Sequence, residues 1–169
     1  MTGRAIGKAV GGIVAWAAFA GLAMAAAQLT GSEAPDFVLK SVAGQNLRLS
    51  EFRGEVVMLA FGATWCGDCR EQLEQLGSMH AHYQDAGVEL LAVSLDQNQK
   101  QAGDLAAVLS SSYPVLFDAG GEVGRLYDVS KVPVMVLIDR AGVVRNVFEG
   151  HKRGSEQQYL ESVQALLRE

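Results

Sequence analysis

The chain has 169 residues, close to the length of one domain, and 49% of them are hydrophobic while 20% are charged. This composition excludes a disordered tail, a collagen-like repeat and a small disulfide-dense protein. The formal net charge is −5, and no cluster of basic residues is longer than the pair Lys152-Arg153. A nucleic-acid-binding protein needs a basic stripe, so the sequence predicts no nucleic-acid partner.

The first 27 residues have the pattern of a secretory signal. Arg4 and Lys8 precede residues 9–27, which have no charged or polar side chain, and small residues near position 25 suit cleavage by a signal peptidase. The alternative is an uncleaved membrane anchor, because 19 apolar residues can span a bilayer. Twelve of these 19 are Ala or Gly, which are weakly hydrophobic and favour cleavage. We predict a signal peptide or N-terminal membrane anchor over residues 1–27.

The remaining residues, 28–169, are expected to form one acidic domain. They keep 12 of the 14 basic residues and all 19 acidic ones, a net charge of −7. Short apolar runs predict strands over 37–39, 47–49, 56–61, 88–94, 115–117, 134–138 and 143–148. Helical spacing predicts helices over 69–86, 97–109, 122–127 and 155–168. This order predicts an α/β fold in which a mixed central β-sheet carries helices on both faces.

Two of the predicted helices allow more detailed expectations. In the helix over 97–109, Leu105, Val108 and Leu109 are expected to face the core. In the last helix, Ser155 is expected to be the N-cap and to form a capping box with Gln158.

The only cysteines of the chain are Cys66 and Cys69. A loop this short would stabilise the fold little as a structural bridge, so we interpret the pair as a chemical site. Cys66 lies between a buried strand and a helix, where unpaired N–H groups and the helix dipole favour an anion. We therefore expect Cys66 to form the attacking thiolate, and Cys69, one turn later, to resolve the mixed disulfide.

The chain resembles the thioredoxin superfamily, and most closely its extracytoplasmic TlpA/ResA-like branch. The similar segments are Ala34-Pro35-Asp36-Phe37, the run 56–61, Ala63-Thr64-Trp65-Cys66-Gly67-Asp68-Cys69, and Val132-Pro133 followed by 134–139 and Gly142. The resemblance covers essentially the whole mature chain. It implies a thioredoxin-like three-layer sandwich with an N-terminal β-extension and an inserted βα unit.

The resemblance also implies roles for residues around the cysteines. Pro133 is expected to be a cis-proline opposite the disulfide, and its cis bond turns the Val132 backbone toward an extended client chain. Trp65, directly before the first cysteine, is expected to support client binding. Asp68 and Glu71 are candidates for tuning the thiol pKa and for proton transfer. The alternative for both acids is a solvated position on the helix surface.

This sequence departs from the family pattern at several positions. Asp68 stands between the cysteines, where many members have Pro. Gln72 and Glu74 stand where many members have Glu and a helix-kinking Pro. Ala60 stands where thioredoxin itself has a buried Asp.

The predicted function is that of an extracytoplasmic thiol:disulfide oxidoreductase, which reduces disulfides of client proteins through Cys66 and Cys69. The resemblance suggests cytochrome c maturation as one such process. A membrane thiol electron donor is the expected second partner, and no organic cofactor is expected. The expected location is the periplasm or the outer face of the cytoplasmic membrane, with membrane anchoring through residues 9–27 as the alternative to secretion.

Two alternative functions use the same fold. A peroxiredoxin-like peroxidase has Pro seven residues and Thr three residues before its reactive cysteine, where this chain has Leu59 and Ala63. A copper- or zinc-binding chaperone would combine the cysteines with His80, His82 or His151. His80 and His82, two residues apart on a helix, point in different directions. We expect His80 to be a half-buried packing residue and His151 to lie in a surface loop.

Overall fold

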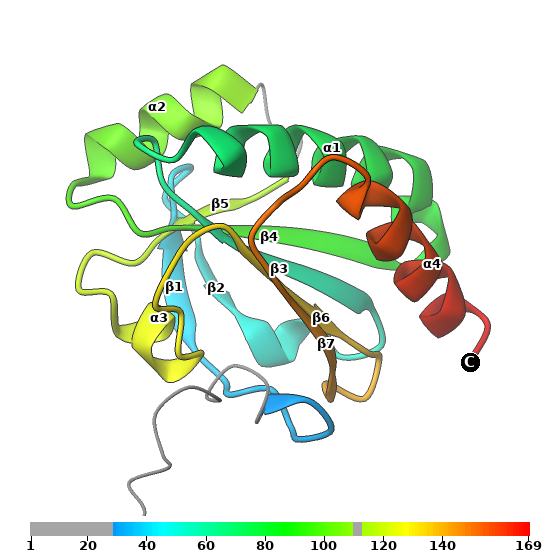
Figure 1. Cartoon of the computed structure of the whole chain (residues 1–169). Helices are drawn as coiled ribbons and strands as arrows, with labels where there is room; N and C mark the ends of the chain where they lie inside the picture. The colour runs from blue at the N-terminus through cyan, green and yellow to red at the C-terminus, as the bar shows by residue number, and fades with distance from the viewer. Residues whose placement is uncertain (1–28, 110–112) are drawn as a thin grey trace, which may run out of the picture.

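In the computed structural model, which describes residues 29–109 and 113–169, the strands form one mixed sheet in the order β2-β1-β5-β4-β3-β6-β7 (Figure 1). The predicted leader over 1–27 lies outside the described residues. Every residue of the central strand β3 is buried. This strand pairs in parallel with β4 and antiparallel with β6. The strand bounds are β1 Val38–Ser41, β2 Asn46–Arg48, β3 Val56–Gly62, β4 Val88–Ser94, β5 Val115–Phe117, β6 Val134–Ile138 and β7 Val144–Glu149.

Helices cover both faces of the sheet, as predicted. The bounds are α1 Gly67–Tyr83, α2 Gln99–Leu109, α3 Glu122–Leu126 and α4 Ser155–Leu167. Helices α1, α2 and α4 pack on one face, where Met58 of β3 lies in their hydrophobic core (Figure 1). On the other face, α3 and the N-terminal segment pack around Leu59. Alternate residues of β3 therefore point into two separate cores, which gives the predicted three-layer sandwich.

The additions that the sequence predicted are both present. The antiparallel hairpin β1–β2 extends the sheet beyond β5, because β1 pairs with β5 and β2 forms the edge. Helix α2 and strand β5 form the inserted unit between β4 and α3. Short 3₁₀ turns follow β2, over Leu49–Phe52, and α1, over Gln84–Ala86.

The chain enters the domain beside the hairpin that joins β6 to β7. Gly31 N–H donates to Val144 O at 2.7 Å, and Ala34 N–H donates to Gly142 O at 2.8 Å. Val144 N–H donates in return to Ser32 O at 2.9 Å. These bonds fix the start of the described chain at the same end of the sheet as the first residues of β3, because Ile138, at the base of the hairpin, pairs with Val57.

Two detailed expectations for the helices are wrong. Val108 is 51% exposed, because it lies about 60° around the helix from Leu105, on the side away from the buried Ala102. The N-cap of α4 is Gly154, at φ 93°, rather than Ser155. The left-handed backbone at Gly154 moves Ser155 into the first turn, where its hydroxyl accepts a hydrogen bond from Lys152 N–H at 3.1 Å.

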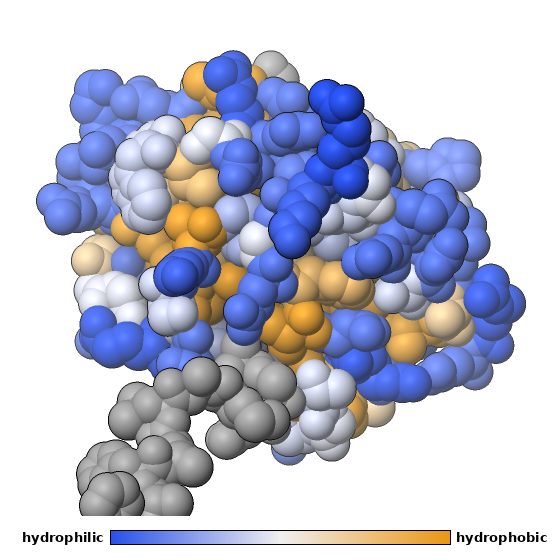
Figure 2. Space-filling view, viewed as in Figure 1, coloured by the Kyte–Doolittle hydropathy of each residue, from blue (hydrophilic) through white to orange (hydrophobic). Residues whose placement is uncertain are grey.

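The face of the molecule drawn in Figure 2 is mainly polar, in keeping with the acidic composition. Polar side chains cover most of the face seen in Figure 2, and apolar ones are visible between them across its middle. Among residues 29–109 and 113–169, no helix is both long enough and apolar enough to cross a membrane.

Candidate active site

The cysteine motif occupies the passage from β3 to α1. The strand ends at Gly62 and the helix begins at Gly67, and Cys66 N–H donates to Ala63 O at 3.1 Å to close the turn between them. Cys66 is the N-cap of α1, and its Sγ accepts a hydrogen bond from Cys69 N–H at 3.2 Å. Its sulfur thus lies at the N-terminus of a 17-residue helix, where the helix dipole favours negative charge.

The two cysteines form a disulfide bond, and their Cα atoms are 5.3 Å apart. They differ in access, because Cys69 is 1% exposed while Cys66 remains partly exposed. Cys69 lies close against β3: a Cβ atom added to Gly62 would be 3.2 Å from Cys69 Cβ. A glycine at the end of the strand therefore leaves the space that the second cysteine occupies. Of the two residues, only Cys66 has surface that a second molecule can contact.

The loop that contains Val132 and Pro133 lies at the same end of the sheet as the cysteine turn. The Val132–Pro133 peptide bond is cis, as predicted. Pro133 directly precedes β6, whose Val134 pairs with Phe61 near the end of β3, so the loop lies at the edge where the cysteine turn begins. A cavity of about 280 Å³ adjoins Val132, and the other residues that line it are Asp128, Val129, Ser130, Lys131, Val134, Glu149 and Gly150. Trp65, 70% exposed, lies on the turn itself.

Comparison with known proteins identifies the family. The model of the AhpC/TSA family matches residues 30–147. The thiol-disulfide oxidoreductase ResA of Geobacillus thermodenitrificans is 34% identical over 134 residues, which cover 79% of this chain and 77% of that protein. ResA of Bacillus subtilis is 32% identical over 120 residues, which cover 71% and 67%. The chain belongs to the AhpC/TSA family, among its ResA-like thiol-disulfide oxidoreductases.

Solved structures agree with this placement of the ResA-like chain. A Chlorobium tepidum protein assigned as thiol:disulfide interchange protein DsbE is 35% identical, with a TM-score of 0.78 over 82% of this chain and 97% of that one. A Bacteroides thetaiotaomicron protein assigned as a protein disulfide isomerase is 27% identical, with a TM-score of 0.74 over 83% and 91%. The thioredoxin-like fold predicted from the sequence is confirmed.

The two acids proposed for pKa tuning lie on the first turns of α1 of this oxidoreductase. Asp68 is exposed at the start of the helix. Glu71 is also exposed, and its carboxylate lies 3.8 Å from His151 Nε2. Their part in proton transfer remains a prediction.

The expectation that His151 is a surface residue is wrong. His151 is only 9% exposed, and its Nδ1 lies 3.4 Å from the hydroxyl of Tyr159 on α4. The same hydroxyl accepts a hydrogen bond at 3.0 Å from Gln72, which is fully buried on α1 one turn beyond Cys69. The loop after β7 thus packs against α4 and the first turns of α1, with Tyr159 between His151 and Gln72. Within the described residues, Gln72 Oε1 and His151 Nε2 are buried without a hydrogen-bond partner.

The other histidines lie apart from the cysteines. His80 is more buried than expected, 4% exposed, and packs edge-on against Tyr113 with its Nε2 3.5 Å from Glu89. His82 is exposed and packs against Tyr83. The part of the chain that the structure describes contains no group of three or more His, Cys, Asp or Glu residues able to hold a metal ion.

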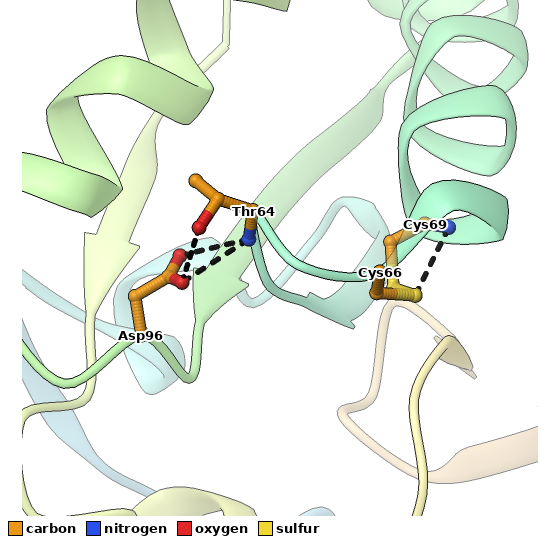
Figure 3. The surroundings of a disulfide bond; sticks show 4 residues. All are labelled: Thr64, Cys66, Cys69 and Asp96. Carbon is orange, nitrogen blue, oxygen red and sulfur yellow. Dashed lines mark hydrogen bonds between the residues drawn. A yellow bond between two sulfur atoms is a disulfide. The ribbon is translucent and has the colours of Figure 1, made fainter.

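Sequence reasoning missed a buried carboxylate behind the cysteine turn. Asp96, 1% exposed, follows β4 and receives hydrogen bonds from the backbone and the hydroxyl of Thr64 (Figure 3). A signal was present: β3 and β4 are parallel and end in register, Gly62 opposite Ser94, so a polar residue just after either strand lies at the active edge.

Proposed function

We propose that this chain is an extracytoplasmic oxidoreductase that reduces disulfides of client proteins. The unequal access of the two sulfurs supports this proposal most strongly. Cys66 is partly exposed at the helix N-terminus, whereas Cys69 is buried beneath it. An accessible nucleophile followed by a shielded resolving thiol suits a protein that releases its client after a brief covalent contact.

The reaction begins with the dithiol form. The Cys66 thiolate attacks one sulfur of the client disulfide; the client S–S bond breaks, a mixed disulfide forms, and the other client sulfur leaves as a thiolate. Cys69 then loses its proton and attacks Cys66 Sγ. The second client sulfur leaves as a thiolate, and the Cys66–Cys69 disulfide forms. Two electrons have passed from the enzyme to the client, whose two sulfurs take up protons from water.

Client binding is proposed for the surface beside Cys66. The place of this loop at the end of β3 and the cavity next to Val132 support a role for Val132 and Pro133 in aligning an extended client segment. The exposed ring of Trp65 offers apolar contact area on the same turn.

The oxidised enzyme needs a source of electrons. We propose a membrane thiol donor for this step, and a location in the periplasm or at the outer face of the cytoplasmic membrane. The leader pattern of residues 1–27 supports export. Cytochrome c maturation is the proposed client process, in line with the family resemblance.

The experiment is a comparison of two trapping variants. Cys69→Ser removes the resolving thiol, so client proteins should accumulate as mixed disulfides through Cys66. Cys66→Ser is the matched control and should trap very few. Equal trapping by both variants, or trapping by Cys66→Ser alone, would show that the nucleophile is misassigned.

An activity assay separates the reductase from the peroxidase. The purified protein should reduce insulin when dithiothreitol is supplied, and should not consume hydrogen peroxide at an enzymatic rate. Ala63, buried and lacking a hydroxyl, supports this expectation because the peroxidase has Thr at that position. Rapid peroxide consumption that depends on Cys66 would contradict the proposal.

A further inference from the structure

We propose that Asp96 is a positioning residue of the redox site. From the end of β4 it holds the turn that carries Cys66, and it thereby biases the Cys66–Cys69 couple toward the disulfide, which makes the dithiol a stronger reductant. The inference rests on the redox activity of the couple and is independent of which client is reduced.

The contacts of Asp96 converge on one residue of the turn. Thr64 N–H lies 3.1 Å from both carboxylate oxygens, and Thr64 Oγ1 donates to Oδ1 at 2.7 Å. Ser94 Oγ donates to Oδ2 at 2.8 Å, and Asp96 N–H donates back to Ser94 Oγ at 3.2 Å. Asp96 is 1% exposed, and both of its carboxylate oxygens accept hydrogen bonds. The bonds with Ser94 fix Asp96 to the end of β4, and the bonds from Thr64 fix the turn to Asp96.

Apart from the bonds of Cys66 to Cys69, the described residues give the turn no other side-chain anchor. In all the side-chain hydrogen bonds of residues 63–65, Thr64 donates and the Asp96 carboxylate accepts. The backbone supports the same connection, because Leu95 N–H donates to Gly62 O at 2.9 Å. Residues 62 and 64 are thus tied to residues 95 and 96, and Figure 3 shows Thr64 facing Asp96 on one side of the turn while Cys66 and Cys69 lie on the other.

Burial of this carboxylate requires an explanation beyond stability. Among the described residues, Asp96 takes part in none of the salt bridges. Burying a carboxylate removes its hydration, which costs free energy, and without a cation nearby hydrogen bonds offset this cost only in part. A neutral polar residue could connect the end of β4 to the cysteine turn with a smaller desolvation cost. The presence of a charge at this fixed position therefore points to a role in the neighbouring redox site.

Two physical effects act in the same direction. A fixed turn keeps the Cys66 sulfur near that of Cys69, which raises the effective concentration of one thiol at the other and favours ring closure. The Cα atoms of Thr64 and Cys66, two residues apart, lie within about 7 Å. The anionic carboxylate bound to Thr64 adds a weaker, longer-range repulsion of a thiolate at Cys66. Both effects disfavour the dithiol relative to the disulfide.

The test is the equilibrium of the purified protein with glutathione, in which the dithiol and oxidised glutathione give the protein disulfide and two reduced glutathione molecules. Asp96→Asn keeps the shape of the side chain, removes its negative charge and replaces one acceptor oxygen with an NH₂ group. We expect it to shift this equilibrium toward the dithiol by about tenfold, or about 30 mV for a two-electron couple. Thr64→Val removes only the hydroxyl contact and should shift it in the same direction by about threefold, or about 14 mV by the same conversion. Thr64→Ser, which keeps the hydroxyl, should stay near the parent protein.

Asp118→Asn is the matched control. Asp118 is also a buried carboxylate, 3% exposed, but it accepts hydrogen bonds from Glu122 N–H and Gly124 N–H of α3. Both Asp variants should lower the melting temperature, and only Asp96→Asn should move the glutathione equilibrium. An equilibrium unchanged in Asp96→Asn and Thr64→Val, or moved equally by Asp118→Asn, would overturn the proposal. If Asp96→Asn does not fold, the pair Thr64→Val and Thr64→Ser decides the question.

The result is separable from the proposed function. The glutathione equilibrium involves no client, so failure to trap clients would leave this inference intact. Conversely, a null result here would leave client reduction in place and remove only the role of Asp96.

Discussion

Asp68 stands between the two cysteines, exposed on the first turn of α1. A carboxylate at this position repels a thiolate at Cys66 and so opposes the stabilising effect of the helix N-terminus. In a dithiol–disulfide couple, a less stable thiolate disfavours the reduced form. Asp68 is therefore expected to make this protein a stronger reductant than a neutral residue at the same position would.

Replacing the charge alone tests this expectation. Asp68→Asn should make the reduction potential less negative, by about 30 mV for every 1.4 kcal/mol of thiolate stabilisation gained. The parent potential should lie nearer to the value of thioredoxin, about −270 mV, than to that of a strong oxidant, about −120 mV. Equilibration with dithiothreitol buffers measures both.

Glu74→Gln is the control for Asp68→Asn. Glu74 is an exposed acid further along the same helix, where it pairs with Arg70, so its removal should leave the potential unchanged. If Asp68→Asn behaves like this control, the Asp68 carboxylate interacts only with solvent. A parent potential near the oxidising value would instead make the protein a disulfide-forming enzyme.

The site residues that were predicted interact with close neighbours in the sequence, whereas those that were missed interact with residues far away in it. Cys66 and Cys69 are neighbours on one helical turn, so their spacing alone indicates a shared chemistry. Asp96 and Thr64 are 32 residues apart, and Gln72 and Tyr159 are 87 apart. Hydrophobic periodicity carries no information about which polar side chains meet across such distances, so both contacts required the structure.

The hairpin between β6 and β7 is held by Asp139. Its Oδ1 accepts hydrogen bonds from Ala141 N–H at 3.0 Å and Val143 N–H at 2.9 Å, and its Oδ2 pairs with Arg145 at 3.1 Å. Partial burial raises the pKa of Asp139, but the bonds from Val143, Arg145 and Ala141 together lower it, so that the pKa lies below its ordinary value of 3.8. Arg145 also pairs with Glu169, which ties the hairpin to the end of the chain.

The lowered pKa gives the stability a definite pH dependence. Because folding favours the ionised form of Asp139, its contribution is complete above the unfolded pKa, near pH 4, and is lost as the pH falls through the folded pKa. Asp139→Asn should reduce the free energy of unfolding by about 1–2 kcal/mol at pH 7. Urea unfolding at pH 7 and pH 3 should show a smaller difference between variant and parent at the lower pH.

A surface carboxylate provides the comparison for Asp139→Asn. Asp104 forms an exposed pair with Lys100 on α2, so Asp104→Asn should change the free energy of unfolding by less than about 1 kcal/mol at either pH. An Asp139→Asn penalty that is equally large at pH 7 and pH 3 would show that the loss comes from packing and not from the charge.

Strands were predicted more accurately than helix ends, and the reason is local. The strands over 88–94, 115–117 and 134–138 occupy the predicted residues because each apolar run is bounded by polar or turn-forming residues. The start of α4 at Ser155 was predicted, but its N-cap was not, because the left-handed Gly154 takes that place and not a side-chain cap. A capping pattern in the sequence shows that a side chain could cap the helix. The path of the preceding loop decides whether that side chain becomes the N-cap.

At the scale of the whole molecule, the mass of the exported protein reports how residues 1–27 are processed. If residues 1–27 are a signal peptide, the intact mass of protein recovered from the periplasm should correspond to a start near Ala26 or Gln28. Cleavage would also remove Trp16 and leave Trp65 as the only tryptophan. Recovery of a chain that retains Met1 in the membrane fraction would establish the anchor instead.

The hydrogen bonds of Gly31 and Ala34 to the β6–β7 hairpin determine which way the enzyme would face. They fix the entry of the chain at the start of β3, whereas the disulfide follows its end, seven residues and about 20 Å away. A retained leader would therefore join the domain at the end of β3 opposite the one that the disulfide follows. An electron donor embedded in the lipid would then have to approach Cys66 from the side of the domain away from the attachment point of the leader.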